Sequence, residues 1–204
     1  MYSLINQHAR AVVDTIEGDF VTNYEWLFQH IDEVGTGPYR KRFRNFWSMN
    51  QSQLIPEFFE IYFDTLSTAL QQAPPLREIV ATVSANAGRR DGTTTIQFSF
   101  ATKLLHMTNP HLPIYDSQVA AFYFFPSPPK SDDQLAQWVG FYEFLTLEYQ
   151  RVLDEGLLAV AINTFREVYP NAIFTDEKVI DSLIWAFVKM SWDGKFRQGA
   201  SIYS

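Results

Sequence analysis

The sequence predicts an all-α protein of about ten helices joined by short loops. Apolar residues recur mostly at intervals of three and four, the spacing of one helix face, and no run of alternating residues is long enough to demand a sheet. A chain of 204 residues, 47% of them hydrophobic, is long enough to bury a full core. We therefore expect residues 1–204 to form a single globular domain, either undivided or with two helical lobes and a cleft between them.

Glycine and proline divide the first half of the chain into helical segments. Five segments have helical periodicity, and they cover residues 4–16, 20–31, 38–49, 54–72 and 76–85. Pro38 suits the first turn of the third segment, because that turn has no use for the missing amide hydrogen. Residues 54–72 carry a broad aromatic stripe, and Pro74 and Pro75 end this helix.

The second half begins after a polar, turn-rich connection at residues 86–92. Helical periodicity returns at residues 95–107, just after Asp116, and at residues 134–154, 156–169 and 175–191. Residues 127–133 form the second clear break, where Ser131 or Asp132 is suited to cap the following helix.

Overall composition excludes several classes of function. The chain has no cysteine, which removes thiolate metal sites, disulfides and cysteine nucleophiles. Sixteen basic residues against 23 acidic residues give a net charge of -7, which on its own opposes binding to nucleic acid or anionic lipid. No signal peptide pattern opens the chain, and its apolar runs are far shorter than the 18 or so residues of a membrane span. The cytoplasm is the expected location.

The charge is unevenly distributed along the chain. Residues 37–106 hold eight basic and five acidic residues, whereas the rest of the chain holds eight basic and eighteen acidic residues. The candidate nucleic-acid contacts are the clustered basic residues of this region: Arg40, Lys41, Arg42, Arg44, Arg89 and Arg90. They are suited to contact phosphates. The alternative is that they pair with the abundant acidic side chains.

Metal and cofactor sites have little support in the sequence. The four histidines are scattered, and no metal-binding spacing occurs. Glu57, Glu60 and Asp64 share one helix face, which we interpret as a solvated face opposite the aromatic stripe. No phosphate-binding glycine loop is present, so we expect neither a metal nor a cofactor.

The most distinctive segment places a helix, a loop with two prolines and an aspartate in succession. Residues 99–106 read SFATKLLH, and residues 109–119 read NPHLPIYDSQV. Asp116 stands where the next helix begins, so its side chain can accept hydrogen bonds from the first free amides of that helix. Helix capping is therefore one interpretation of Asp116.

The segment also resembles the helix-hairpin-helix DNA glycosylase superfamily. Ile114, Tyr115, Asp116 and Ser117, with Val119, match the part of that family that carries a catalytic aspartate. The resemblance implies a compact orthogonal array of helices, Asp116 as the catalytic carboxylate and, as in bifunctional members, Lys103 as a lysine nucleophile. The chain also looks like a broad group of bacterial proteins that have a similar segment and a late Leu-Ile-Trp helix, here residues 183–185 near Lys189.

What the resemblance implies about function is cleavage of an N-glycosidic bond in duplex DNA, with or without lyase activity. The target base would leave the duplex and enter an aromatic pocket. The alternative is a non-enzymatic, protein-binding or regulatory helical module that keeps the fold and uses Asp116 only as a cap.

Overall fold

The computed structural model describes residues 1–51, 54–85, 88 and 95–192. Within these ranges the chain forms eleven α-helices, two short 3-10 helices (η1, Ile31–Glu33, and η2, Met49–Gln51) and no strand, which confirms the all-α prediction. The α-helices are α1 (Tyr2–Gln7), α2 (Ala9–Asp14), α3 (Gly18–Gln29), α4 (Gly37–Phe46), α5 (Pro56–Gln72), α6 (Leu76–Ala85), α7 (Phe98–Thr108), α8 (Ser117–Phe122), α9 (Gln134–Asp154), α10 (Ala159–Val168) and α11 (Asp176–Trp192).

Local sequence signals explain where several helices begin and end. The Thr36 side chain accepts a hydrogen bond from the Tyr39 amide at 3.3 Å, and Pro38 occupies the first turn of α4. Ala73 closes α5 in the left-handed conformation, with φ of 48°, directly before Pro74. The predicted segments at residues 76–85 and 134–154 coincide with α6 and α9.

Two expected boundaries were wrong. The first predicted helix is interrupted at His8, so residues 4–16 contain α1 and α2 rather than one helix. The predicted helix at residues 38–49 ends at Phe46, because the chain turns at Ser48, whose φ is 54°. Apolar periodicity continues through both turns, and periodicity alone does not detect such breaks.

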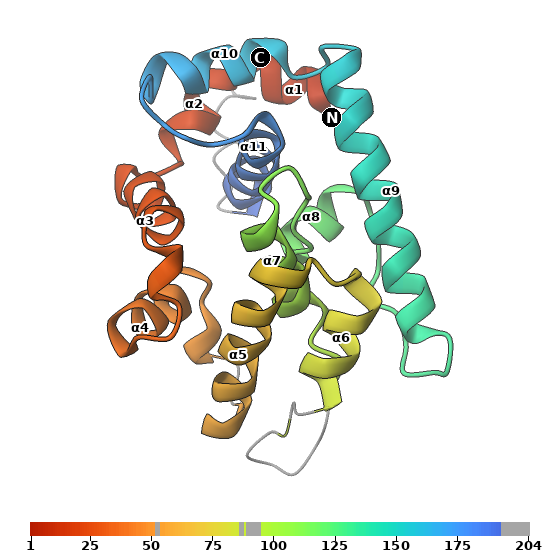
Figure 1. Ribbon diagram of the computed structural model, residues 1–204. Helices are drawn as coiled ribbons and strands as arrows, with labels where there is room; N and C mark the ends of the chain where they lie inside the picture. The colour runs from red at the N-terminus through yellow and green to blue at the C-terminus, as the bar shows by residue number, and fades with distance from the viewer. Residues whose placement is uncertain (52–53, 86–87, 89–94, 193–204) are drawn as a thin grey trace.

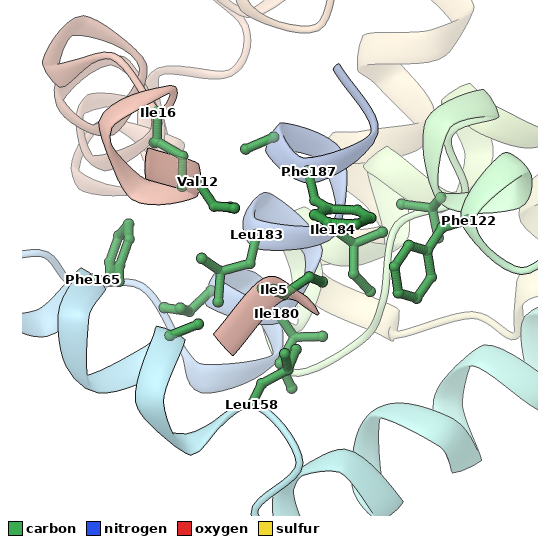
Figure 2. Packing of buried hydrophobic residues seen from close by; sticks show 14 of the residues in the cluster. Ile5, Val12, Ile16, Phe122, Leu158, Phe165, Ile180, Leu183, Ile184 and Phe187 are labelled. Atoms are coloured by element: carbon green, nitrogen blue, oxygen red, sulfur yellow. The ribbon is translucent and has the colours of Figure 1, made fainter. Parts of the chain in front are cut away.

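The apolar residues gather into two clusters. The first cluster joins α1, α2, α8, α10 and α11, and its members include Val12, Phe122, Leu183 and Phe187. In Figure 2 residues of α1, α2, α8 and α11 meet in this cluster, and Phe165 of α10 packs at its edge. The second cluster joins α4, α5, α6 and α7. The long helix α9 contributes to both clusters, and in Figure 1 it runs along one side of the molecule.

Helix α11 is an enclosed element of the fold, and most of its residues are buried. In Figure 1 it lies inside the array, with α1, α2 and α10 on one side and α7 and α8 on the other. It packs against α8, α2, α10 and α9. Residues 178–184 are all buried, including Lys178, Asp181 and Ser182. Charged side chains at this depth need partners, because burial removes their hydration.

Candidate functional site

A pocket of about 330 Å³ lies where the two clusters meet. Its walls come from the start of α3 and the residues before it, the end of α4, α7, the loop before α8, and α11. The lining combines aromatic and charged side chains, chiefly Phe20, Phe46, Trp47, Trp185, Glu17, Lys103, Asp116, Lys178, Asp181 and Lys189. The pocket therefore contains both residues that the sequence proposed as catalytic.

One face of α11 forms the longest wall of this pocket. Five of its residues line the pocket, and they are Lys178, Asp181, Ser182, Trp185 and Lys189. Their spacing of three, four and seven residues places them on one stripe of the helix. The opposite stripe, which includes Leu183 and Phe187, packs into the first cluster. Helix α11 thus supports the core and presents charged groups to the pocket.

Lys103 reaches the pocket from α7. Only 8% of the residue is exposed, and its amine lies 5.7 Å from the Trp47 ring centroid and 5.3 Å from that of Phe100. Within the described part of the chain, the amine has no hydrogen-bonding or ion-pair partner. Burial lowers the pKa of Lys103, although the negative charges of Asp116 and Asp181 act against this shift. A buried amine with a lowered pKa is the form in which lysine acts as a nucleophile.

Asp116 lies at the start of α8 and is half-buried. One of its carboxylate oxygens accepts a hydrogen bond from the Gln118 amide at 2.7 Å, so the capping interpretation is confirmed. The preceding loop is fixed to α7, because the Tyr115 amide donates to the Thr102 hydroxyl at 3.1 Å. This bond keeps Asp116 beside the helix that carries Lys103. Capping and a place in the pocket are therefore compatible.

Lys178 and Asp181 form a buried ion pair that sequence reasoning missed. The Lys178 amine lies 2.7 Å from Asp181 Oδ2, and the two side chains are 2% and 10% exposed. The same amine lies 5.3 to 5.6 Å from the ring centroids of Phe20, Tyr24 and Trp47, which fixes it in space. The available signal was two opposite charges three residues apart within an apolar helical segment.

Nearby polar groups remain without partners. Asp181 Oδ1, the Tyr149 hydroxyl and the Trp47 indole nitrogen are buried, and among the described residues none of them makes a hydrogen bond of standard geometry. Asp181 and Tyr149 nevertheless interact with each other: after the larger effect of burial, the Asp181 charge and a hydrogen bond between the two side chains help to raise the Tyr149 pKa. Trp47 and Asp181 both line the pocket, so a polar atom without a partner, the Trp47 nitrogen, belongs to its walls. Buried groups of this kind call for a functional explanation.

His106, on the same helix as Lys103, has a structural role. Its Nδ1 lies 2.7 Å from the Leu112 carbonyl, which can only accept a hydrogen bond. Nδ1 therefore carries the proton, and Nε2 accepts from the Tyr24 hydroxyl at 2.8 Å. Burial lowers the pKa of His106 to about 3, and the imidazole is neutral at pH 7. It fixes the loop before α8 to α7.

The basic residues of α4 lie apart from this pocket. Arg40 pairs with Glu60 and, at 3.5 Å, with Asp64. The other two arginine side chains cover aromatic rings. The guanidinium of Arg42 lies 4.3 Å from the Trp26 ring centroid, and the guanidinium of Arg44 lies 3.8 Å from the Phe59 ring centroid. Lys41 is exposed. Arg40, Lys41 and Arg44 line a separate hollow of about 410 Å³.

Two of the expected phosphate contacts, Arg89 and Arg90, lie outside the described residues. Among the residues that are described, the three carboxylates of α5 do not form a metal site, and no group of histidine and acidic side chains could hold a metal ion. Glu57, Glu60 and Asp64 are exposed, as expected for a solvated face.

Comparison with protein families, curated proteins and solved structures finds no match to this chain. None of the helices within the described ranges is both long enough and apolar enough to span a membrane. The pocket itself is therefore the feature of this protein that points to a function.

Proposed function

We propose that the pocket is the active site of a DNA N-glycosylase-like enzyme, with Asp116 as the catalytic carboxylate and Lys103 as the nucleophile. One observation carries the proposal. Two residues singled out from one short sequence motif line the same pocket, and the lysine amine there has no partner among the described residues. Its lowered pKa favours the neutral, nucleophilic form.

The chemistry follows from the charges at the pocket. Breaking a bond between a sugar carbon and a base nitrogen develops positive charge on the sugar, which a fixed carboxylate stabilises. The neutral Lys103 amine attacks C1′ as the base departs with the bonding electrons. Loss of a proton from the attached nitrogen and opening of the sugar ring then give a Schiff base. The aromatic walls formed by Phe46 and Trp47 offer a surface for a base flipped out of the duplex.

The direct test is base release from duplex oligonucleotides that each carry one damaged or mispaired base. We expect Asp116→Asn to lower release about 100-fold or more, because a neutral amide stabilises the charged transition state poorly. Borohydride should trap a protein–DNA adduct with the wild-type chain and none with Lys103→Ala. If the wild-type chain releases no base from any duplex of the panel and does not bind these duplexes at low salt, the proposed enzymatic function is excluded. An adduct that persists in Lys103→Ala would exclude Lys103 as the nucleophile.

A second candidate function is a protein-binding module, and a separate observation favours it. Phe124 is 83% exposed and Leu147 is 73% exposed, while Phe144, one turn before Leu147 on α9, is 42% exposed. Phe144 also contacts Tyr123, next to Phe124, at 5.3 Å between ring centroids. Exposed apolar residues that lie together are typical of protein interaction sites. Substituting Phe124 and Leu147 by serine should abolish capture of a partner protein while leaving base release unchanged.

A further inference from the structure

Trp47 carries a hydrogen-bond donor in the wall of the pocket that no described group accepts. Only 7% of the residue is exposed, and its indole nitrogen is buried without a partner among the described residues. Trp138 also has a buried indole nitrogen, but its side chain interacts with Tyr115, and it is not part of the pocket lining. A buried donor without an acceptor costs free energy, so the Trp47 donor calls for an acceptor that a ligand brings.

The surroundings of the Trp47 ring hold this donor in one direction. The ring centroids of Phe43, Phe46 and His106 lie 6.2, 4.7 and 6.5 Å from that of Trp47. The chain then turns at Ser48, which also lines the pocket and has a φ of 54°, a strained conformation for a residue other than glycine. Backbone strain of this kind is concentrated at functional sites. The indole N–H is therefore in place before a ligand arrives, which lowers the cost of binding.

The Trp47 donor lies beside the amine that the proposed reaction uses. The Lys103 amine is 5.7 Å from the Trp47 ring centroid, and both side chains line the pocket. In that reaction the amine comes within about 3.5 Å of the sugar carbon that carries the base. A base attached to this carbon is then within reach of the indole nitrogen. Its hydrogen-bonding groups lie on its edge, so Trp47 is placed to distinguish one base edge from another.

We propose that Trp47 is a specificity-determining residue of this site, which accepts a base with a keto oxygen at its indole N–H and rejects a base with an amino group in the same place. This inference rests on the proposed N-glycosylase function. An indole N–H can donate a hydrogen bond but cannot accept one. Uracil and hypoxanthine carry a keto oxygen where cytosine and adenine carry an amino group. With an amino group, two donors would face each other and both would stay unsatisfied. The substrate class is therefore keto bases, including those formed by deamination of cytosine and adenine.

Two pairs of duplexes test this role: uracil against cytosine, each opposite guanine, and hypoxanthine against adenine, each opposite thymine. Trp47→Phe keeps an aromatic ring and removes the donor. We expect it to lower the single-turnover release of uracil and hypoxanthine about tenfold or more, and to narrow their preference over cytosine and adenine. Trp138→Phe removes a buried indole outside the pocket lining and is the matched control, which should change neither rate nor preference. Unchanged release of both keto bases in Trp47→Phe, beside a wild-type chain that releases them, would overturn the role.

A second measurement needs no base release and uses the wild-type chain, so it holds even where Trp47→Phe does not fold. In isotope-labelled protein each indole N–H gives an NMR signal, and correlation with the backbone assigns the signal of Trp47. We expect free hypoxanthine to move this proton signal downfield, as a new hydrogen bond does, and adenine at the same concentration to leave it in place. No shift with hypoxanthine, or an equal shift with adenine, overturns the role of Trp47. A shift with hypoxanthine alone, in a chain that releases no base from any duplex, overturns the proposed enzymatic function and keeps Trp47 as the group that recognises a keto base.

Discussion

Lys103 and Lys178 show how environment divides one residue type between two roles. Both amines lie near the Trp47 ring, at 5.7 and 5.6 Å from its centroid. Lys178 has Asp181 as an ion-pair partner at 2.7 Å, whereas Lys103 has no partner among the described residues. Two neighbouring ammonium groups disfavour each other's charge, and only one of them is compensated by direct contact. In the proposed reaction, Lys103 is therefore the amine of the two that we expect to react.

The lowered pKa of Lys103 has a consequence for stability. Between its folded pKa and the unfolded value of about 10.4, the unfolded chain binds the proton more strongly, so this lysine destabilises the fold at neutral pH. Lys103→Met should unfold at the same or a higher urea concentration than wild type at pH 7, and its stability should depend less on pH between 7 and 10. Lys130→Met, at an exposed position, is the control. A clear loss of stability in Lys103→Met would contradict the burial argument.

His106 should make the protein sensitive to acid. Its pKa is about 3 in the folded state and about 6.5 when unfolded, so as pH falls below 6.5 only the unfolded state takes up the proton. The contribution of neutral His106 to the free energy of unfolding is fully present above pH 6.5 and declines as pH falls toward 3. Between pH 7 and pH 5 the loss is about 2 kcal/mol. His106→Gln should reduce that loss in urea unfolding at the two pH values. The exposed His111→Gln should leave it unchanged.

At the scale of single elements, substitutions of Asp116 distinguish its capping of α8 from its proposed catalytic role. Asparagine caps a helix as well as aspartate does, but alanine does not, so Asp116→Ala should lose about 1 kcal/mol of stability and Asp116→Asn should lose little. Both variants should lose base release. Urea unfolding beside the oligonucleotide assay makes the comparison. If Asp116→Asn keeps full release, the aspartate serves only as a cap.

Helix α11 was expected near residues 175–191, and the structure places it at Asp176–Trp192. Its existence was predictable from apolar periodicity. Its contribution to the pocket was not, because the stripe from Lys178 to Lys189 has meaning only when it faces α7 and the loop before α8. Only the Trp185 and Lys189 end of the stripe lay in a segment that the sequence singled out.

At the scale of the whole molecule, the core depends on α11. Leu183 is completely buried in the first cluster, and Leu183→Ala should cost about 2 to 5 kcal/mol through lost burial and the cavity it leaves. Leu147→Ala, at a position that is 73% exposed, should change stability by less than about 0.5 kcal/mol. Denaturant midpoints for the two variants provide the measurement. Similar losses in both would mean that α11 is not central to the fold.

The distribution of charge gives a prediction about DNA. Lys41 is exposed on α4, whereas Arg40 is already paired with Glu60 and Asp64. If this helix contacts phosphates, Lys41→Ala should weaken duplex binding equally for all sequences and reduce the slope of log affinity against log salt by about one. Arg40→Ala should have a smaller effect. An unchanged slope in Lys41→Ala would remove α4 from the DNA interface.

The sequence by itself determined the all-helical class, most helix boundaries and the Asp116 cap, because these depend on periodicity and on residues close together in the chain. The pair Lys103 and Asp116 was singled out by a resemblance, and its catalytic role stays a proposal. Only the tertiary structure decided that α11 supplies Lys178 and Asp181 to the same pocket, and that the α4 arginines lie elsewhere. The physical reason is that burial, and the changes in pKa that burial causes, arise when distant helices pack together. No local pattern carries that information.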